Sequence, residues 1–247
     1  MEPEFCGLKN FRQLLFEPVF WLALRNNFFL LVGSLLVQLP IALGIALVLH
    51  YPTWGKSFFR TVFFTPMIIP TAAIAVLWQY LYEPQNGVFT AIIRLFKADF
   101  TYAWLATPGT SMLWIFVTIC WQYIGFHTVL FMAGLSTIPE ELCEAARLDG
   151  ASELQICRRI ILPCLKPTLA VSATLSIIGS LKYFDLVYLM GSGLPETSRE
   201  VLATYVYRLA FDENQGRYGY GSAVAVLLFL LALLIVIPLQ IRKSEQY

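Results

Sequence analysis

Long apolar blocks alternate with short polar stretches along this chain of 247 residues. Five of the blocks contain no charged residue, and they cover 26–55, 61–82, 100–139, 167–181 and 218–241. Because about 20 apolar residues suffice for a helix to cross the hydrocarbon core of a bilayer, each block can hold one crossing. The pattern predicts transmembrane spans near 27–49, 61–82, 111–135, 167–190 and 219–241.

The composition fits a protein that is embedded in lipid. Hydrophobic residues make up 58% of the chain and charged residues 13%, whereas soluble domains carry about 25% charged residues. Any one block could be the buried helix of a large soluble protein, but five of them leave too little polar surface to solvate a globule. The expected fold class is all-α, a polytopic membrane protein with five transmembrane helices.

Charge and cysteine content exclude other functions. The net charge of +1 gives no reason to expect a nucleic-acid partner. The five cysteines show no Cys-x-x-Cys spacing, so neither a disulfide framework nor a metal site is expected. Acidic Glu2 and Glu4 stand where a secretory signal peptide would have basic residues.

The order of the spans decides which polar segments share a side of the membrane. Successive spans alternate in direction, so the loop 136–166 lies on the same side as 50–60 and the tail 242–247. Basic residues divide equally, eight on each side, but the loops on this side are shorter, which favours it as cytoplasmic. Residues 1–26 are then extracytoplasmic, so either this segment is translocated without a signal or a preceding span is missing.

The loop 136–166 has the sequence signals of two helices joined by a turn. Thr137 followed by Glu140 has the spacing of a capping box at the start of the first helix. Gly150 can take positive φ and lets the chain turn sharply, and Ser152 with Gln155 repeats the capping pattern. The loop is predicted to be a helix–turn–helix that lies along the membrane surface.

The first of these helices is acidic and rich in alanine. The small side chains of Ala145 and Ala146 would let the backbone of another protein approach closely, and Glu144 could meet a basic partner. The alternative is a connector that rests on lipid headgroups, but such helices usually carry bulky apolar anchors and a strongly basic face. The residues therefore favour docking to a protein.

The spacing of the polar loop resembles that of a known family. Glu144-Ala145-Ala146, Asp149-Gly150 and Leu162-Pro163 are similar to the cytoplasmic loop of ABC importer permeases, the binding-protein-dependent inner-membrane components. In that family the loop is the coupling helix, which seats in a groove of the ATPase subunit. The resemblance implies that these seven residues couple the chain to a separate ATPase in the inner membrane of a bacterial-type cell.

Further segments are similar to the carbohydrate-uptake branch of these permeases, the maltose and glycerol-3-phosphate type. They are Phe184-Asp185, Thr204 to Tyr207, Ala210-Phe211 and Gly219 to Ala223. The chain departs from the branch at 190–195, where Gly191-Ser192-Gly193-Leu194-Pro195 replaces the common Thr-x-Gly-Gly-Pro. The resemblance implies a sugar or sugar derivative as substrate, an extracytoplasmic solute-binding protein that docks on 83–110 and 191–218, and a second permease subunit, a different chain.

The resemblance also bears on the N-terminus. Residues 7–26 resemble the external stretch that follows the first span in these permeases, whose core has six spans. An N-terminal span is therefore expected to be missing from this chain, and a true five-span variant is the alternative.

The chain is not expected to hydrolyse ATP. Gly55-Lys56-Ser57 resembles the end of a Walker A loop, but His50 stands where that loop requires glycine, and no strand precedes it. We expect no catalytic residue and no cofactor in this chain, with ATP bound by the ATPase subunit. His127 is alone in its span and is interpreted as a hydrogen-bonded packing residue.

Three residues near the end of the fourth span are candidates for the substrate pathway: Lys182, Tyr183 and Asp185. Lys182 and Asp185 are three apart and would be neighbours in a helix. Either they pair with each other, with Lys182 reaching the headgroups, or Asp185 faces the pore and binds sugar hydroxyls.

Three other functions remain open at this point. The chain could be an ABC permease for a non-sugar solute, although the 183–223 pattern argues against it. It could be an ion- or proton-coupled carrier, which would be favoured by more intramembrane charges or an inverted repeat. It could also be a truncated membrane subunit that does not transport.

Overall fold

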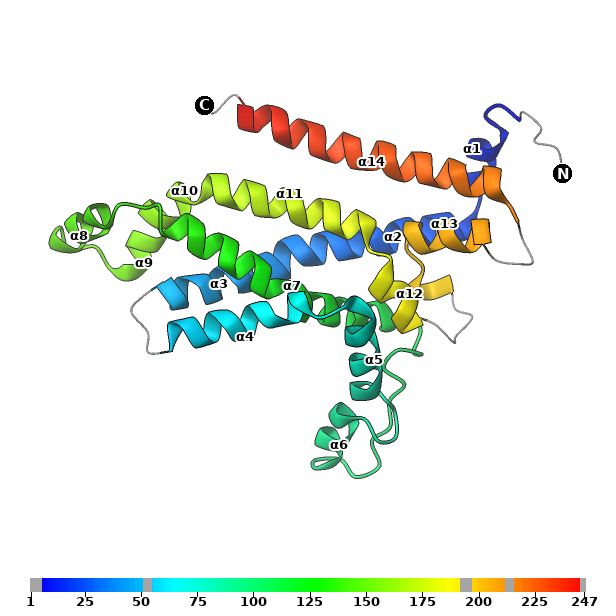
Figure 1. The fold of residues 1–247 in the computed structure, drawn as a ribbon, viewed down its shortest axis with the longest axis horizontal. Helices are drawn as coiled ribbons and strands as arrows, with labels where there is room; N and C mark the ends of the chain where they lie inside the picture. The colour runs from blue at the N-terminus through cyan, green and yellow to red at the C-terminus, as the bar shows by residue number, and fades with distance from the viewer. Residues whose placement is uncertain (1–5, 51–54, 192–196, 212–215, 245–247) are drawn as a thin grey trace. The chain divides into compact units, whose positions relative to one another are not determined.

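The computed structural model of the chain describes residues 6–50, 55–191, 197–211 and 216–244. Every regular element within these ranges is a helix (Figure 1). Three helices are long and apolar enough to span a membrane, namely Pro18–His50, Ser111–Leu135 and Tyr218–Pro238. Two bent helix pairs also have the length and composition of a span, Ser57–Ile68 with Thr71–Leu81 and Glu153–Cys164 with Lys166–Lys182, and each forms either a broken span or a re-entrant loop. Counting each pair as one span gives the five that the apolar blocks predict.

The first span is longer than expected and contains a π-helix. Helix α2 (Pro18–Gly33) continues through the π-helix η1 (Ser34–Gln38) into α3 (Leu39–His50). In a π-helix each N–H bonds to the carbonyl five residues back, and such segments have no reliable sequence signal. Pro40 lies two residues after the π-helix, and its backbone nitrogen has no N–H to donate the usual helical bond.

The second predicted span, 61–82, is two helices and not one. Helix α4 (Lys56–Ile68) ends before Pro70, and α5 (Thr71–Leu81) begins after it with Pro70 as its N-cap. Pro70 has no N–H, and its ring disfavours a helical conformation for the residue before it. Pro66, in contrast, lies inside α4, and the helix continues past it.

The contacts divide the chain into two compact units. The first unit comprises 1–32, 69–119 and 178–235, and the second comprises 33–68, 120–177 and 236–247. In the first unit, α1 (Lys9–Leu14), α2, α13 (Leu202–Phe211) and α14 (Tyr218–Ser244) share an apolar core. Two buried asparagines connect the segments of this unit. Asn26 donates to the carbonyls of Ser198 and Glu200. Asn27 donates to the carbonyl of Ser180 and accepts the backbone N–H of Leu202.

The loop 83–110 of the first unit packs in an aromatic cluster that also includes Tyr82 and Trp114 on either side of it. Trp104 contacts Trp114 edge to face at 4.6 Å between ring centroids, and Tyr82 and Phe89 lie against the same indole. The short helix α6 (Val88–Arg94) is held by Thr90, whose hydroxyl receives the indole N–H of Trp104 at 3.0 Å. This loop is therefore an ordered structure.

In the second unit, α3, α4, α11 (Lys166–Lys182) and α7 (Ser111–Leu135) pack closely. A Cβ at Gly125 of α7 would lie 1.8 Å from the carbonyl oxygen of Phe63 in α4, so only glycine permits this approach. His127 Nδ1 lies 2.7 Å from the hydroxyl oxygen of Ser172, which confirms its prediction as a hydrogen-bonded packing residue. The apolar core of this unit carries the polar loop 136–166 at one end.

Candidate coupling site

The first helix of the polar loop is α8 (Glu140–Leu148). The predicted capping box at its start is wrong, because the N-cap is Pro139 and no side chain caps the helix. The hydroxyl of Thr137 donates instead to the carbonyl oxygen of Gly134 at 2.8 Å. Thr137 thus completes the last turn of α7, and its side chain is not available to α8.

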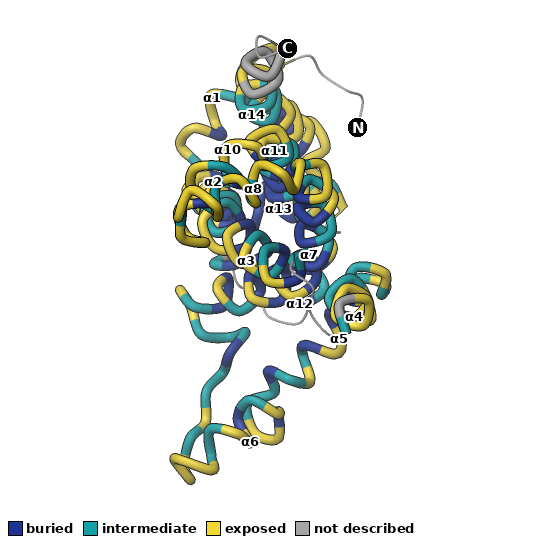
Figure 2. Tube along the Cα trace, turned by 90° about the vertical axis from the view of Figure 1, so that its left-hand side faces the viewer, coloured by how far each residue is buried: buried dark blue, intermediate teal, exposed yellow. Residues whose placement is uncertain are grey.

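Helix α8 has an inner and an outer face. Cys143 and Ala146, three residues apart, pack against the core of the second unit, which includes Ile156 and Ile161. The outer face consists of exposed residues at helical spacing: Glu141, Glu144, Ala145 and Leu148. Figure 2 accordingly shows α8 in the exposed and intermediate colours, and none of its residues is buried.

The exposed residues differ from the expectation in one detail. The two alanines do not act together, because Ala145 lies on the outer face while Ala146 packs inward. Leu148, on the outer face with Ala145, is 90% exposed.

The turn after α8 depends on Gly150. Its φ is +80°, and Gly150 and Ala151 donate their N–H groups to the carbonyls of Arg147 and Ala146. These are the two bonds of a Schellman motif, which ends a helix with a residue of positive φ. The predicted turn is confirmed, and the exposed Asp149 lies at its C-cap.

The second helix begins as predicted. Ser152 accepts from the N–H of Gln155, and the Gln155 side chain accepts from the N–H of Ser152 at 2.8 Å. An ion pair fastens the turn, since Arg147 Nε lies 2.7 Å from Glu153 Oε1. The two helices therefore form one hinge-like element.

Leu162 and Pro163 lie in the last turn of the second helix. It runs through α9 (Glu153–Ile156), the π-helix η2 (Cys157–Ile161) and α10 (Leu162–Cys164). Leu162 is half-buried and Pro163 is exposed. The next helix leaves at an angle of 67° to this segment, so the two residues mark the point where the loop turns into the fourth span.

A cavity of about 390 Å³ lies beside α8 within the second unit. Its lining comes from the ends of α3 and α7, from α8 and from η2. The residues are His50, Leu135, Ser136, Ile138, Glu140, Cys143, Arg147 and Ile161. The inner side of α8 is therefore not close-packed along this part of its length.

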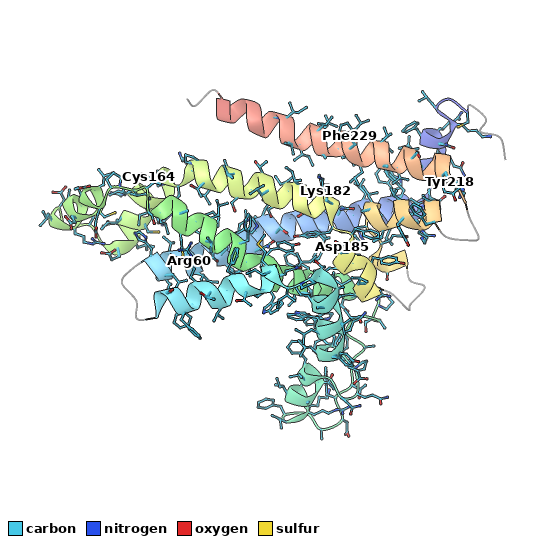
Figure 3. All side chains as sticks on the ribbon, viewed as in Figure 1. Arg60, Cys164, Lys182, Asp185, Tyr218 and Phe229 are labelled. Carbon is cyan, nitrogen blue, oxygen red and sulfur yellow. The ribbon has the colours of Figure 1, made fainter. Side chains whose placement is uncertain are left out.

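The substrate-pathway candidates lie at a helix break. Helix α11 ends at Lys182 and α12 (Asp185–Gly191) begins at Asp185, so these residues are not three apart in one helix (Figure 3). The structure describes no ion pair between them, which removes the mutual pairing considered from the sequence. Both are exposed, and Tyr183 between them is half-buried. The family pattern was compared at 190–195, and residues 192–195 of it lie outside the described ranges.

The described residues contain no group of three or more His, Cys, Asp or Glu side chains that could hold a metal ion. Three to five candidate membrane spans and a surface helix with one exposed face describe a multi-pass membrane protein. The chain belongs to the binding-protein-dependent transport system inner membrane components, whose family profile matches residues 38–245.

Relatives and solved structures agree with this family. The chain is 35% identical over 236 residues to the probable ABC transporter permease PH1215 of Pyrococcus horikoshii, covering 95% of this chain and 80% of that protein. It is 33% identical over 233 residues to the trehalose/maltose transport system permease MalF of Thermococcus litoralis, covering 94% and 77%. A bacterial ABC transporter that imports the acidic polysaccharide alginate matches with a TM-score of 0.89 at 25% identity, covering 99% and 85%.

The protein is thus a permease subunit of a binding-protein-dependent ABC importer in the inner membrane. It works with an ATPase and a periplasmic binding protein, as in the alginate importer solved with its binding protein. Permeases of this family have no catalytic site of their own and use no cofactor, because the partner ATPase hydrolyses ATP.

Proposed function

We propose that the importer to which this permease belongs takes up a sugar or sugar derivative. The support is that relatives of the chain are named for trehalose and maltose, for xylose and arabinose, and for diacetylchitobiose. These names cover several sugars but share one chemical class. The alternative, a non-sugar solute, has the weaker support of a methionine importer with TM-score 0.58 and 20% identity, which bears on the fold alone.

The outer face of α8 is the proposed contact with the ATPase. Glu144, Ala145 and Leu148 are exposed and lie on one side of a helix whose other side is packed. In this proposal the loop 136–166 faces the cytosol, and closure of the ATPase dimer pushes α8. Gly150, Asp149, Leu162 and Pro163 shape the element that passes the motion to the flanking helices α7 and α11.

The proposed contact with the binding protein lies on the loop 83–110. At its tip, Leu95 and Phe96 follow the last turn of α6, and Phe96 is 88% exposed. Their backbone N–H groups close the turn onto Ile92 and Ile93, which holds the two side chains in place. An ordered loop with an exposed apolar tip suits a partner that must bind and release.

Substrate passes, in this proposal, between the chain and a second, different permease subunit. Lys182, Tyr183 and Asp185 are retained as candidates for its pathway. Lys182 ends one helix, Asp185 begins the next, and the two form no ion pair with each other. The charge of each is therefore available to a hydroxyl-rich solute. The break between α11 and α12 also leaves backbone groups without helical partners, which is tolerated in a membrane only at a cavity or an interface.

The coupling proposal is tested in the complete importer, reconstituted with its binding protein. Leu148→Ser is expected to lower the ATPase activity that loaded binding protein stimulates by about tenfold, the effect of losing a buried apolar anchor at an interface. Leu142→Ser is the matched control, because Leu142 lies on the same helix but off the outer face and is 47% exposed. Equal stimulation in both variants would refute the assignment.

The substrate proposal is tested separately by uptake into vesicles that hold the reconstituted importer. Labelled maltose, xylose and diacetylchitobiose are supplied with the binding protein encoded beside this permease, together with methionine as a non-sugar. Uptake of at least one sugar and not of methionine supports the proposal. Uptake of methionine alone overturns the sugar assignment and leaves the coupling result intact.

A further inference from the structure

A basic hollow opens on the second helix of the polar loop. It has a volume of about 460 Å³ and is lined by Leu154, Gln155, Arg158 and Arg159. Both arginines are exposed, and the described residues include no acidic partner for either of them. Arg147 on the neighbouring helix differs, because Glu153 neutralises its charge.

The π-helix η2 explains why the two arginines face outward together. Ile156 and Ile161 are both buried in the core of the second unit, although they are five residues apart. In an α-helix two such residues point about 140° away from each other. The π hydrogen-bond pattern brings residues five apart onto one side, so the opposite side receives Arg158 and Arg159.

The remaining two lining residues suit an amphiphilic ligand. The side-chain oxygen of Gln155 accepts the Ser152 N–H, so its amide group is the donor that it can present to the hollow. Leu154 is 68% exposed and supplies an apolar wall. A phospholipid matches this lining. Its phosphate can accept from the two guanidinium groups and the amide, and its acyl chains can contact the apolar wall.

The hollow lies close in the chain to the start of a span. Helix α11 begins at Lys166, which is exposed and seven residues after Arg159. Because the second helix leads directly into this span, we expect its exposed side to lie near the lipid headgroups. Figure 3 labels Cys164 at the junction of α10 and α11, next to the point where the chain enters the span.

We infer that this hollow binds the phosphate of an anionic phospholipid in the cytoplasmic leaflet, with Arg158 and Arg159 as its ligands. The inference takes the orientation of the loop from the proposed function but does not depend on the sugar. A lipid bound there holds the second helix of the coupling element at the membrane surface. The first helix stays available to the ATPase.

The test measures lipid retention on the complete importer by native mass spectrometry. The importer is placed in nanodiscs of phosphatidylcholine mixed with phosphatidylglycerol, and the anionic adducts that survive on the permease are counted. The double variant Arg158→Gln/Arg159→Gln is expected to bind phosphatidylglycerol about tenfold more weakly, because each arginine near an anionic surface contributes severalfold to affinity. Arg158→Lys/Arg159→Lys should retain most of the preference.

Arg60→Gln is the matched control, since Arg60 is exposed at the start of α4 on the same expected side but does not line the hollow. Unchanged adducts in the double variant overturn the inference. Loss of the ATPase subunits with unchanged adducts also overturns it, because the arginines would then bind an acidic surface of that protein. Displacement of the lipid by millimolar inorganic phosphate would identify an adventitious ion site only.

Discussion

Two loops of similar length, 83–110 and 136–166, follow opposite designs. The loop 83–110 packs in an aromatic cluster, in which Phe89 and Trp104 of the loop meet Tyr82 and Trp114 of the flanking helices. The loop 136–166 packs its inner residues, such as Cys143, on the aliphatic core of the second unit. We call the loop 83–110 the platform. We call the loop 136–166 the lever, because its position depends on the core against which it packs.

The hydrogen bonds of the two loops differ in the same way. Arg94 crosses its loop and donates to the carbonyls of Gln85 and Phe100 at 2.7 and 2.8 Å. The loop 136–166 contains short-range polar contacts, such as the capping box of Ser152 with Gln155 and the pair of Arg147 with Glu153 across the turn. Local bonds keep the shape of each helix while allowing the element to move as a body.

The largest effect is expected where the platform loses its core. Trp104→Ala removes a buried indole and its bond to Thr90, and such changes cost about 3–5 kcal/mol. We expect the loop 83–110 to become sensitive to protease and stimulation by the binding protein to be lost. Limited proteolysis with mass spectrometry checks the first effect.

Tyr80→Ala serves as the control for that experiment, because Tyr80 is an aromatic residue of α5 that is exposed. If Trp104→Ala left the cleavage pattern unchanged, the loop would not depend on its aromatic core. The contrast between the loops 83–110 and 136–166 would then be wrong.

A smaller effect is expected at the turn of the lever. Gly150→Ala forces a Cβ into positive φ, which costs about 1–2 kcal/mol. No atom lies within 4 Å of that Cβ, so the cost is conformational and not steric. Gly150→Asn should recover part of the loss, because asparagine tolerates this region.

The readout for Gly150 is the ratio of stimulated to basal ATPase activity in the reconstituted importer. Alanine should lower this ratio and asparagine should lower it less. If alanine and asparagine were equally harmful, side-chain size and not backbone conformation would control the turn.

The start of the second helix gives a smaller effect still. Ser152→Ala removes the N-cap of α9, which costs about 1 kcal/mol. Ser152→Asp keeps a side-chain acceptor and should behave like the natural residue. Hydrogen exchange of the Gln155 amide measures the loss, and equal protection in both variants would contradict the capping role.

The sequence predicted those features of the coupling site that depend on local chemistry. Gly150 at the turn and the Ser152–Gln155 capping box require only neighbours in the chain, and both are present. The Thr137–Glu140 capping box failed because the end of α7 competes for Thr137, and a four-residue pattern contains no information on that competitor.

Orientation of side chains required contacts that are distant in the chain. Helical spacing placed Ala145, Ala146 and Leu148 on α8 but did not say which side faces the core, since Ile156 and Ile161 decide that. The five apolar blocks predicted the spans. The break between Lys182 and Asp185 was not predicted, because no proline or glycine lies between these residues. The π-helices could not be predicted from the sequence either, because no residue type is specific to them.

The smallest effect concerns pH and the platform. The pKa of the Glu83 carboxyl lies below its ordinary value of 4.5, chiefly because the backbone N–H of Asn86 donates to it. The N–H of Gln85 adds a bond of 3.0 Å, and the charge of Arg94 acts in the same direction. A carboxyl whose pKa is lowered by folding stabilises the folded loop above the unfolded pKa.

That stabilisation is lost as the pH falls below about 4.5 and Glu83 becomes protonated. We expect protease sensitivity of the loop 83–110 to rise slightly in this range, and Glu83→Gln to show the same sensitivity already at pH 7. Glu83→Gln should leave the loop 136–166 unchanged, because the groups that bond to Glu83 belong to the loop 83–110. An equal response of both loops to Glu83→Gln would mean that the substitution acts on the whole protein, and the contrast between the two loops would then be wrong.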